Sequence, residues 1–80
     1  MNPHLSRAQL LVQQERYDMA ADVLRQGLLA RPEDPQTHAL LAMCLSEQEK
    51  FDEATEHAHA AVHLAPDNGY MHYVLASVMS

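Results

Sequence analysis

The sequence repeats itself with a period of 34 residues, and this period limits the folds that the chain can adopt. The stretch ERYDMAADVLRQGLLARP at residues 15–32 returns as EKFDEATEHAHAAVHLAP at residues 49–66. A fixed period of this size predicts a stack of similar units, because one such unit cannot bury its apolar face alone. The aligned positions include Tyr17 with Phe51, Asp18 with Asp52, Ala20 with Ala54, Gly27 with Ala61, Pro32 with Pro66, and His4 with His38 and His72.

Helix start and stop signals divide each period into two helices. Asn2-Pro3 and Asp34-Pro35 each combine a capping side chain with a proline, which is tolerated in the first turn of a helix. Asp18, Asp52 and the pair Asp67-Asn68 offer further caps. We therefore expect five helices, from Pro3 to about Gln14, Asp18 to Pro32, Pro35 to about Gln48, Asp52 to Pro66, and Asn68 to the last residue.

Apolar residues predict which helix faces are buried. The second helix has a stripe made of Ala20, Ala21, Leu24, Leu28 and Leu29. The third helix is apolar almost all round, which predicts the buried centre of the stack.

These features resemble the tetratricopeptide repeat, a helix-turn-helix unit of 34 residues. The residues that carry the resemblance are Ala8, Ala20, Gly27, Pro32, Ala42, Ala54, Ala61 and Pro66, with Tyr17 and Phe51 each followed by Asp. The resemblance implies an all-α fold, a right-handed α-solenoid of antiparallel helix pairs. One domain over residues 1–80 then contains repeat 1 (1–34), repeat 2 (35–68) and the first helix of a third repeat (69–80).

The fifth helix is apolar and carries no charged residue after Asp67. It resembles the first helix of a repeat that lacks its second helix, so we expect the chain to be a fragment of a longer repeat array. The alternative is a small protein that hides this apolar face by self-association, for example as a homodimer. The self-association residues would be Val74, Leu75, Val78 and Met79.

Charge and composition argue against several partners and compartments. The net charge is −6, and residues 33–80 carry eight acids against Lys50 alone. We expect no nucleic-acid partner, because this chain repels phosphates. No stretch is long and apolar enough for a membrane span, and no signal peptide is visible, so we expect no membrane partner and a cytoplasmic protein.

No residue pattern indicates catalysis, and we expect no enzyme and no cofactor. Cys44 lies among apolar residues mid-helix, which favours a core role over a reactive thiol. His59 and His63 are four residues apart on one helix face and form a weak candidate metal pair, but a firm zinc site needs further ligands. His4, His38 and His72 recur with the period, which indicates a structural role between repeats.

The resemblance implies a concave groove, lined by the first helices of the repeats, that binds a peptide or a partner helix. The groove residues by resemblance are Leu5, Gln9, Val12, Gln13, Gln36, Ala39, Met43, Glu47, Tyr70, Tyr73 and Ser77. Some family members hold a C-terminal carboxylate with cations at positions that here are uncharged, so we expect no such binding. The leading hypothesis is a non-catalytic protein-protein interaction scaffold. The alternatives are a self-association element and a regulatory arm of a larger protein.

Overall fold

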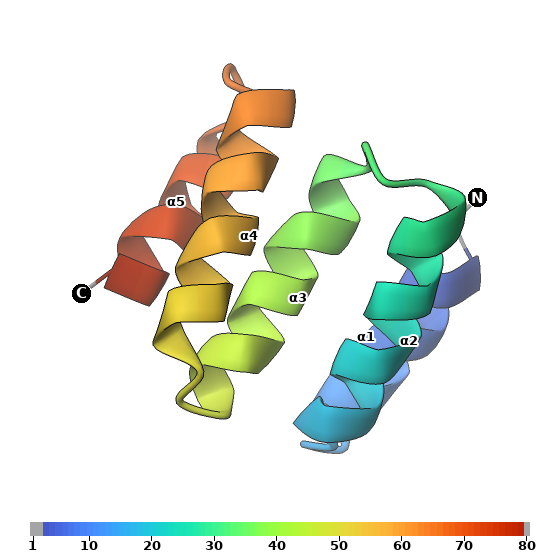
Figure 1. The fold of residues 1–80 in the computed structure, drawn as a ribbon. Helices are drawn as coiled ribbons and strands as arrows, with labels where there is room; N and C mark the ends of the chain where they lie inside the picture. The colour runs from blue at the N-terminus through green and yellow to red at the C-terminus, as the bar shows by residue number, and fades with distance from the viewer. Residues whose placement is uncertain (1–2, 80) are drawn as a thin grey trace.

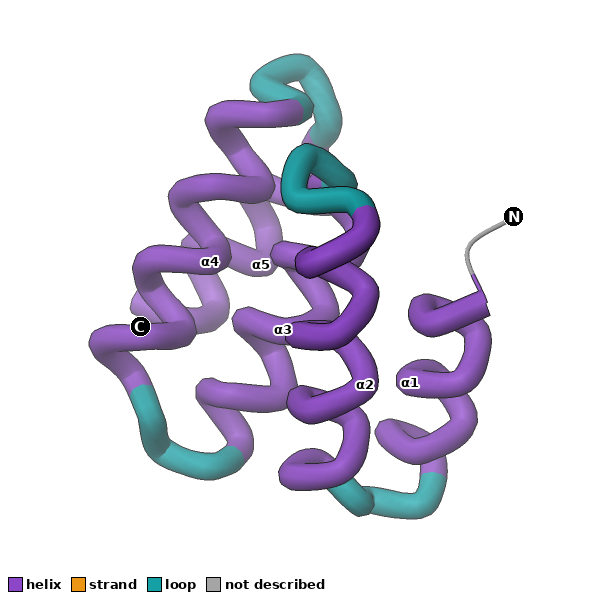
Figure 2. Tube along the Cα trace, turned by 45° about the vertical axis from the view of Figure 1, so that its right-hand side comes forward, coloured by secondary structure: helices purple, strands orange, loops and turns teal. Residues whose placement is uncertain are grey.

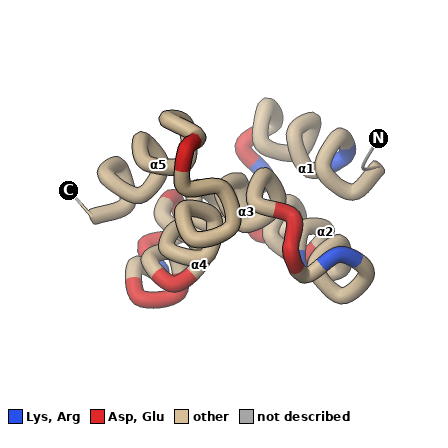
Figure 3. Tube along the Cα trace, turned by 90° about the horizontal axis from the view of Figure 1, so that it is seen from above, with Lys and Arg blue, Asp and Glu red and all other residues tan. Residues whose placement is uncertain are grey.

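The computed structural model describes residues 3–79, which form five helices and no strand. Their bounds are α1 Pro3–Gln13, α2 Tyr17–Ala30, α3 Pro35–Glu47, α4 Phe51–Leu64 and α5 Gly69–Met79. Successive helices run antiparallel and form a helical repeat solenoid, as predicted (Figures 1 and 2). The first helices of the repeats, α1, α3 and α5, form one layer, and α2 and α4 form the other (Figure 3).

The turn inside each full repeat ends a helix in the same way. Glu15 and Glu49 have positive φ angles of 59° and 61°, a left-handed conformation in which glycine is more usual. The N–H of each glutamate bonds a carbonyl three residues earlier, at 2.9 and 3.0 Å. The N–H of the next residue bonds a carbonyl five residues earlier, at 2.9 Å in both turns. This Schellman motif satisfies the last carbonyls of α1 and α3.

The loops between repeats also share one cap. Asp34 accepts a bond from Gln36 N at 3.1 Å, and Asn68 accepts one from Tyr70 N at 2.9 Å, so both predicted caps are confirmed. The predicted caps Asp18 and Asp52 are wrong, because they lie inside the first turns of α2 and α4. In these positions their negative charges still interact favourably with the positive end of the helix dipole.

The core is centred on α3, which contacts all four other helices. The largest fully buried side chains are Leu24, Leu41, Leu45, Met71, Val74, Thr37 and Cys44. Thr37 is satisfied because its hydroxyl donates to Asp34 Oδ2 at 2.9 Å. One predicted stripe residue is wrong: Leu29 is 86% exposed, because it lies past the edge of the α2 face that packs on its neighbours.

Candidate binding surface on the first helices

A hollow of about 330 Å³ lies where α1, α3 and α5 come together. The residues that line it are Leu5 and Gln9 of α1, Gln36 and Leu40 of α3, Asn68 of the α4–α5 loop, and Tyr70 and Met71 of α5. Three helices and one loop thus supply amide, phenol and apolar groups to one place. This combination suits a peptide, because amides bond a backbone while apolar groups receive a side chain.

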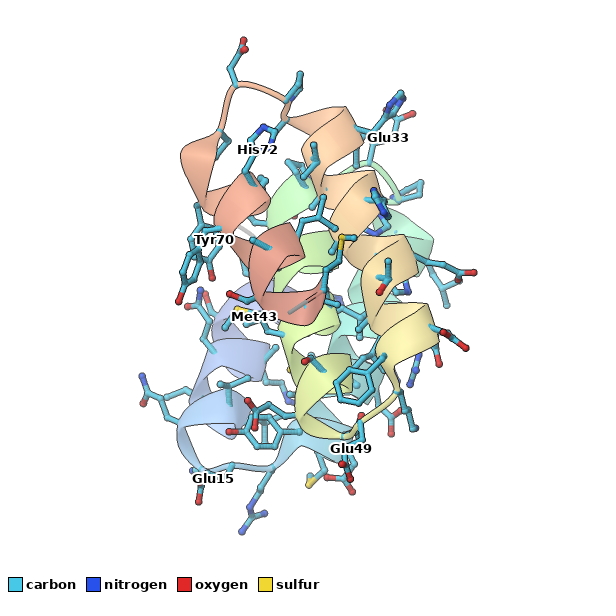
Figure 4. All side chains as sticks on the ribbon, turned by 90° about the vertical axis from the view of Figure 1, so that its left-hand side faces the viewer. Glu15, Glu33, Met43, Glu49, Tyr70 and His72 are labelled. Atoms are coloured by element: carbon cyan, nitrogen blue, oxygen red, sulfur yellow. The ribbon has the colours of Figure 1, made fainter. Side chains whose placement is uncertain are left out.

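Four predicted groove residues line this hollow: Leu5, Gln9, Gln36 and Tyr70. Tyr70 is 50% exposed, and its hydroxyl lies 3.3 Å from Met43 Sδ. Figure 4 shows Tyr70 projecting from α5 on the side of the molecule where α1 lies. The Tyr70 ring thus lies at the rim of the hollow, and its hydroxyl contacts Met43 of α3.

The remaining predicted groove residues lie outside the hollow, and one is not on the surface. Ala39 has no exposed area, because the small alanine side chain is covered where α3 packs in the stack, so it is not a lining residue. Tyr73 is 64% exposed and its ring centroid lies 6.3 Å from that of Tyr70. Val12 is partly buried, and the other predicted groove residues, Gln13, Met43, Glu47 and Ser77, are exposed on these helices.

Three lining residues were not among the predicted groove residues: Leu40, Asn68 and Met71. Leu40 follows Gln36 by four residues, so helical spacing alone places them on one face. Asn68 belongs to a loop, whose path the helical period does not give. Met71 is almost fully buried, at 1% exposure.

The seven residues that line the hollow carry no charge. Charged side chains lie elsewhere, with acids gathered on α4 and the loops, while α5 has none (Figure 3). Arg25 of α2 donates to Glu53 Oε2 of α4 at 2.8 Å and joins the two full repeats. This hydrogen bond lowers the pKa of Glu53.

Two of the periodic histidines make the same bond. The Nε2 of His38 lies 2.8 Å from Pro32 O, and the Nε2 of His72 lies 2.7 Å from Pro66 O. Each ring ties the first helix of a repeat to the end of the preceding repeat, which supports the structural role expected for them. His4 lies in α1 against Gly27, where an added Cβ would be 3.0 Å from the His4 Cβ.

His38 also contacts His57 of α4, with the two Nδ1 atoms 3.0 Å apart. Since a carbonyl oxygen only accepts, His38 Nε2 is a donor and its Nδ1 is the acceptor in the neutral ring. The neutral pair therefore has the proton on His57 Nδ1. Burial lowers the pKa of His57, and the nearby His38 lowers it further.

The candidate metal pair, His59 and His63, is exposed on α4. Within residues 3–79, no group of three or more His, Cys, Asp and Glu side chains is placed to hold a metal ion. The pair thus has no third protein ligand in the described part of the chain.

The proposed self-association residues divide into two sets. Val74 has no exposed area and Val78 is 5% exposed, because both pack into the core, so they are not surface residues of this structure. Leu75 is partly buried, and Met79 is 63% exposed. An exposed face of α5 therefore exists, but it is narrower than the predicted one.

Cys44 is 1% exposed in α3. Burial, with a smaller effect of Glu47, raises the pKa of its thiol to about 11. A thiol with this pKa is protonated at neutral pH and is a poor nucleophile. None of the five helices is both long and apolar enough to cross a bilayer.

The helix pairs, the repeated turns and the repeated histidine bonds define a helical repeat protein. The tetratricopeptide repeat family model matches residues 5–69, which is more than half of the chain. The chain therefore belongs to the tetratricopeptide repeat family. A comparison with curated proteins gives no significant match. Repeats of this family are in general non-catalytic modules that mediate protein-protein interaction.

Proposed function

We propose that the hollow between α1, α3 and α5 binds an uncharged peptide segment of a partner protein. The observation that carries this proposal is its lining, in which Gln9, Gln36, Asn68 and Tyr70 surround the apolar Leu5, Leu40 and Met71. An uncharged lining gives no compensation to a buried charge, so a charged residue of the partner is disfavoured at this point.

The amides and the phenol supply hydrogen bonds to the peptide backbone, while the apolar floor receives one aliphatic or aromatic side chain. Tyr70 is the best candidate to anchor the peptide, because its ring offers apolar contact area and its hydroxyl can form a hydrogen bond. Its position at the rim, 3.3 Å from Met43 Sδ, limits how far the ring must move on binding.

The test uses a library of random twelve-residue peptides displayed on phage, selected against the folded protein. Synthetic copies of the enriched peptides are then titrated against the protein and its variants. Tyr70→Ala and Leu40→Arg are expected to weaken binding by about tenfold or more, as truncation or charging of a central contact does. Met79→Ala is the matched control, because Met79 is exposed on the same helix and does not line the hollow.

Two results would contradict the proposal. One is that no uncharged peptide is enriched. The other is that the enriched peptides bind Tyr70→Ala and Leu40→Arg as well as they bind the unchanged protein. A C-terminal acidic peptide serves as a separate probe and is expected to bind no tighter than about 1 mM, since the lining offers no cation.

A further inference from the structure

The repeat provides an internal measure of which face of α5 is uncovered. Ala8 of α1 and Ala42 of α3 occupy equivalent positions and have no exposed area, whereas the equivalent Ala76 of α5 is exposed. The main neighbour of α1 is α2, the second helix of its repeat, whereas α5 has no second helix of its own among residues 3–79. Leu45 and Met79 show the same contrast, at 0% and 63% exposure. Ala76 and Met79 thus mark the face that a second helix would cover.

His72 shows that this face is already arranged as in a complete repeat. Its bond to Pro66 O matches the bond of His38 to Pro32 O, so both rings are held in the same way. In repeat 2 the other ring nitrogen of His38 meets His57 of the second helix. Among residues 3–79, Pro66 O is the hydrogen-bond partner of the His72 ring, which leaves its Nδ1 available to accept.

The second helices of the two full repeats show what such a face accepts. Ala54, Ala58 and Ala61 of α4 are spaced by four and three residues, and all three are fully buried. In α2 the equivalent first and third positions, Ala20 and Gly27, are also small and buried, whereas the middle position is the large, buried Leu24. Small side chains thus recur at the first and third positions, seven residues apart. Small side chains at this spacing allow two helix axes to approach closely.

We propose that the face formed by His72, Leu75, Ala76 and Met79 binds a separate amphipathic helix of the α4 type. That helix carries two small residues seven positions apart, as Ala54 and Ala61 are in α4. It also carries an N–H donor three residues after the first small residue, where α4 has His57, and this donor bonds His72 Nδ1.

The proposed face continues an interface that the molecule already contains. Arg25 of α2 pairs with Glu53 near the start of α4, and the position equivalent to Arg25 one repeat later is the exposed His59. An acid in the first turn of the docked helix would therefore lie near His59. Since α5 itself has no charged side chain, this contact sets the direction of the docked helix.

The probe is a synthetic peptide of residues 49–66 of this chain, which contains α4, acetylated and amidated at its ends. It is labelled with a fluorophore, and binding is followed by anisotropy and by the gain in helical circular dichroism. We expect saturable binding with a Kd below about 1 mM. Ala76→Arg in the protein is expected to weaken binding by about tenfold or more, because the arginine side chain fills the contact. Leu10→Arg, an exposed position of α1, is the control and leaves binding unchanged.

Peptide variants test the proposed chemistry. Ala61→Leu in the peptide keeps a good helix former but adds bulk at the position equivalent to Gly27, where α2 lies against His4 of α1, so it is expected to abolish binding. His57→Ala in the peptide removes the donor to His72 and is expected to weaken binding without abolishing it.

Three outcomes would overturn the proposal. The first is the absence of saturable binding up to about 1 mM peptide. The second is binding that Ala76→Arg does not weaken, which would place the peptide elsewhere, for example in exchange with α4 itself. The third is a dimer of the protein that Ala76→Arg dissociates, since a second copy would then cover this face. Because Ala76 is exposed, Ala76→Arg is expected to stay folded, which circular dichroism checks.

Discussion

His38 and His57 meet across the α3–α4 interface with their Nδ1 atoms 3.0 Å apart and their ring centroids 5.2 Å apart. One hydrogen lies between the two nitrogens, and the outer nitrogen of His38 is held by Pro32 O. Burial and the nearby His38 ring oppose the addition of a proton to His57 and lower its pKa. The interface between the two helices of repeat 2 is therefore sensitive to pH.

We expect the free energy of unfolding to fall as the pH drops below about 6.5. The pKa of His57 is lower in the folded protein than the 6.5 of an unfolded chain, so the unfolded chain binds the proton first. The contribution of the neutral His57 to the free energy of unfolding is therefore fully present above pH 7. It is lost progressively as the pH falls toward the pKa of His57 in the folded protein. Urea unfolding at pH 5, 6, 7 and 8 measures this change.

His57→Gln is expected to remove this part of the pH dependence, because the amide N–H still donates to His38 Nδ1 but does not titrate. His59→Gln is the matched control on the exposed side of α4 and is expected to keep it. If His57→Gln and the unchanged protein lose stability equally between pH 7 and 5, His57 is not the group responsible.

The period of 34 residues predicted the helices and their order, because helix length and apolar spacing depend on local sequence. It also predicted that His38 and His72 share a role. It did not predict the contact of His38 with His57, because the equivalent of His57 in repeat 1 is Val23 and the contact is therefore not periodic. A contact present in a single repeat depends on packing between helices, which the sequence pattern does not give.

The candidate site was predicted only in part, for a related reason. Three of the expected groove residues, Leu5, Gln36 and Tyr70, line the same hollow, since all three lie on first helices related by the repeat. Ala39 shares its repeat position with Leu5, yet its side chain is covered in the centre of the stack. Equivalent positions differ in exposure between a central helix and an edge helix, and spacing alone does not distinguish them.

Cys44 is expected to react slowly with thiol reagents while the protein is folded. A pKa of about 11, against 9.0 for a free thiol, lowers the thiolate fraction near pH 8 by about a hundredfold, and burial blocks access as well. Ellman's reagent at pH 8, with and without denaturant, measures the difference. A Ser6→Cys variant in a Cys44→Ala background places a thiol on the exposed side of α1 and should react at once. Equal rates for the two folded proteins would contradict the burial of Cys44.

Glu49→Gly is expected to stabilise the protein by about 0.5 to 1 kcal/mol, although it adds a flexible residue. At a φ of 61° a residue with a Cβ is strained, whereas glycine is not. The relief of this strain exceeds the free energy that glycine costs by adding conformational entropy to the unfolded chain. Glu15→Gly should give a similar gain, because its turn has the same hydrogen bonds. Lys50→Gly is the control, since Lys50 has a negative φ of −94° and offers no such strain to relieve. Urea unfolding of the three variants measures their free energies of unfolding. A lower free energy of unfolding for Glu49→Gly than for the unchanged protein would contradict the prediction.

The ion pair of Arg25 with Glu53 is expected to contribute less than about 1 kcal/mol to stability, despite its distance of 2.8 Å. The two side chains are 40% and 44% exposed, so water and salt screen their attraction. A double-mutant cycle with Arg25→Gln and Glu53→Gln measures the coupling, and the coupling should shrink further in about 0.5 M salt. The lowered pKa of Glu53 gives a second check, because this contribution is present above pH 4.5 and is lost as the pH falls through the folded pKa. This window lies below that of His57, so the two effects separate in one pH series. A coupling that exceeds about 2 kcal/mol and resists salt would show instead that the pair is shielded from solvent and fixes the angle between the two repeats.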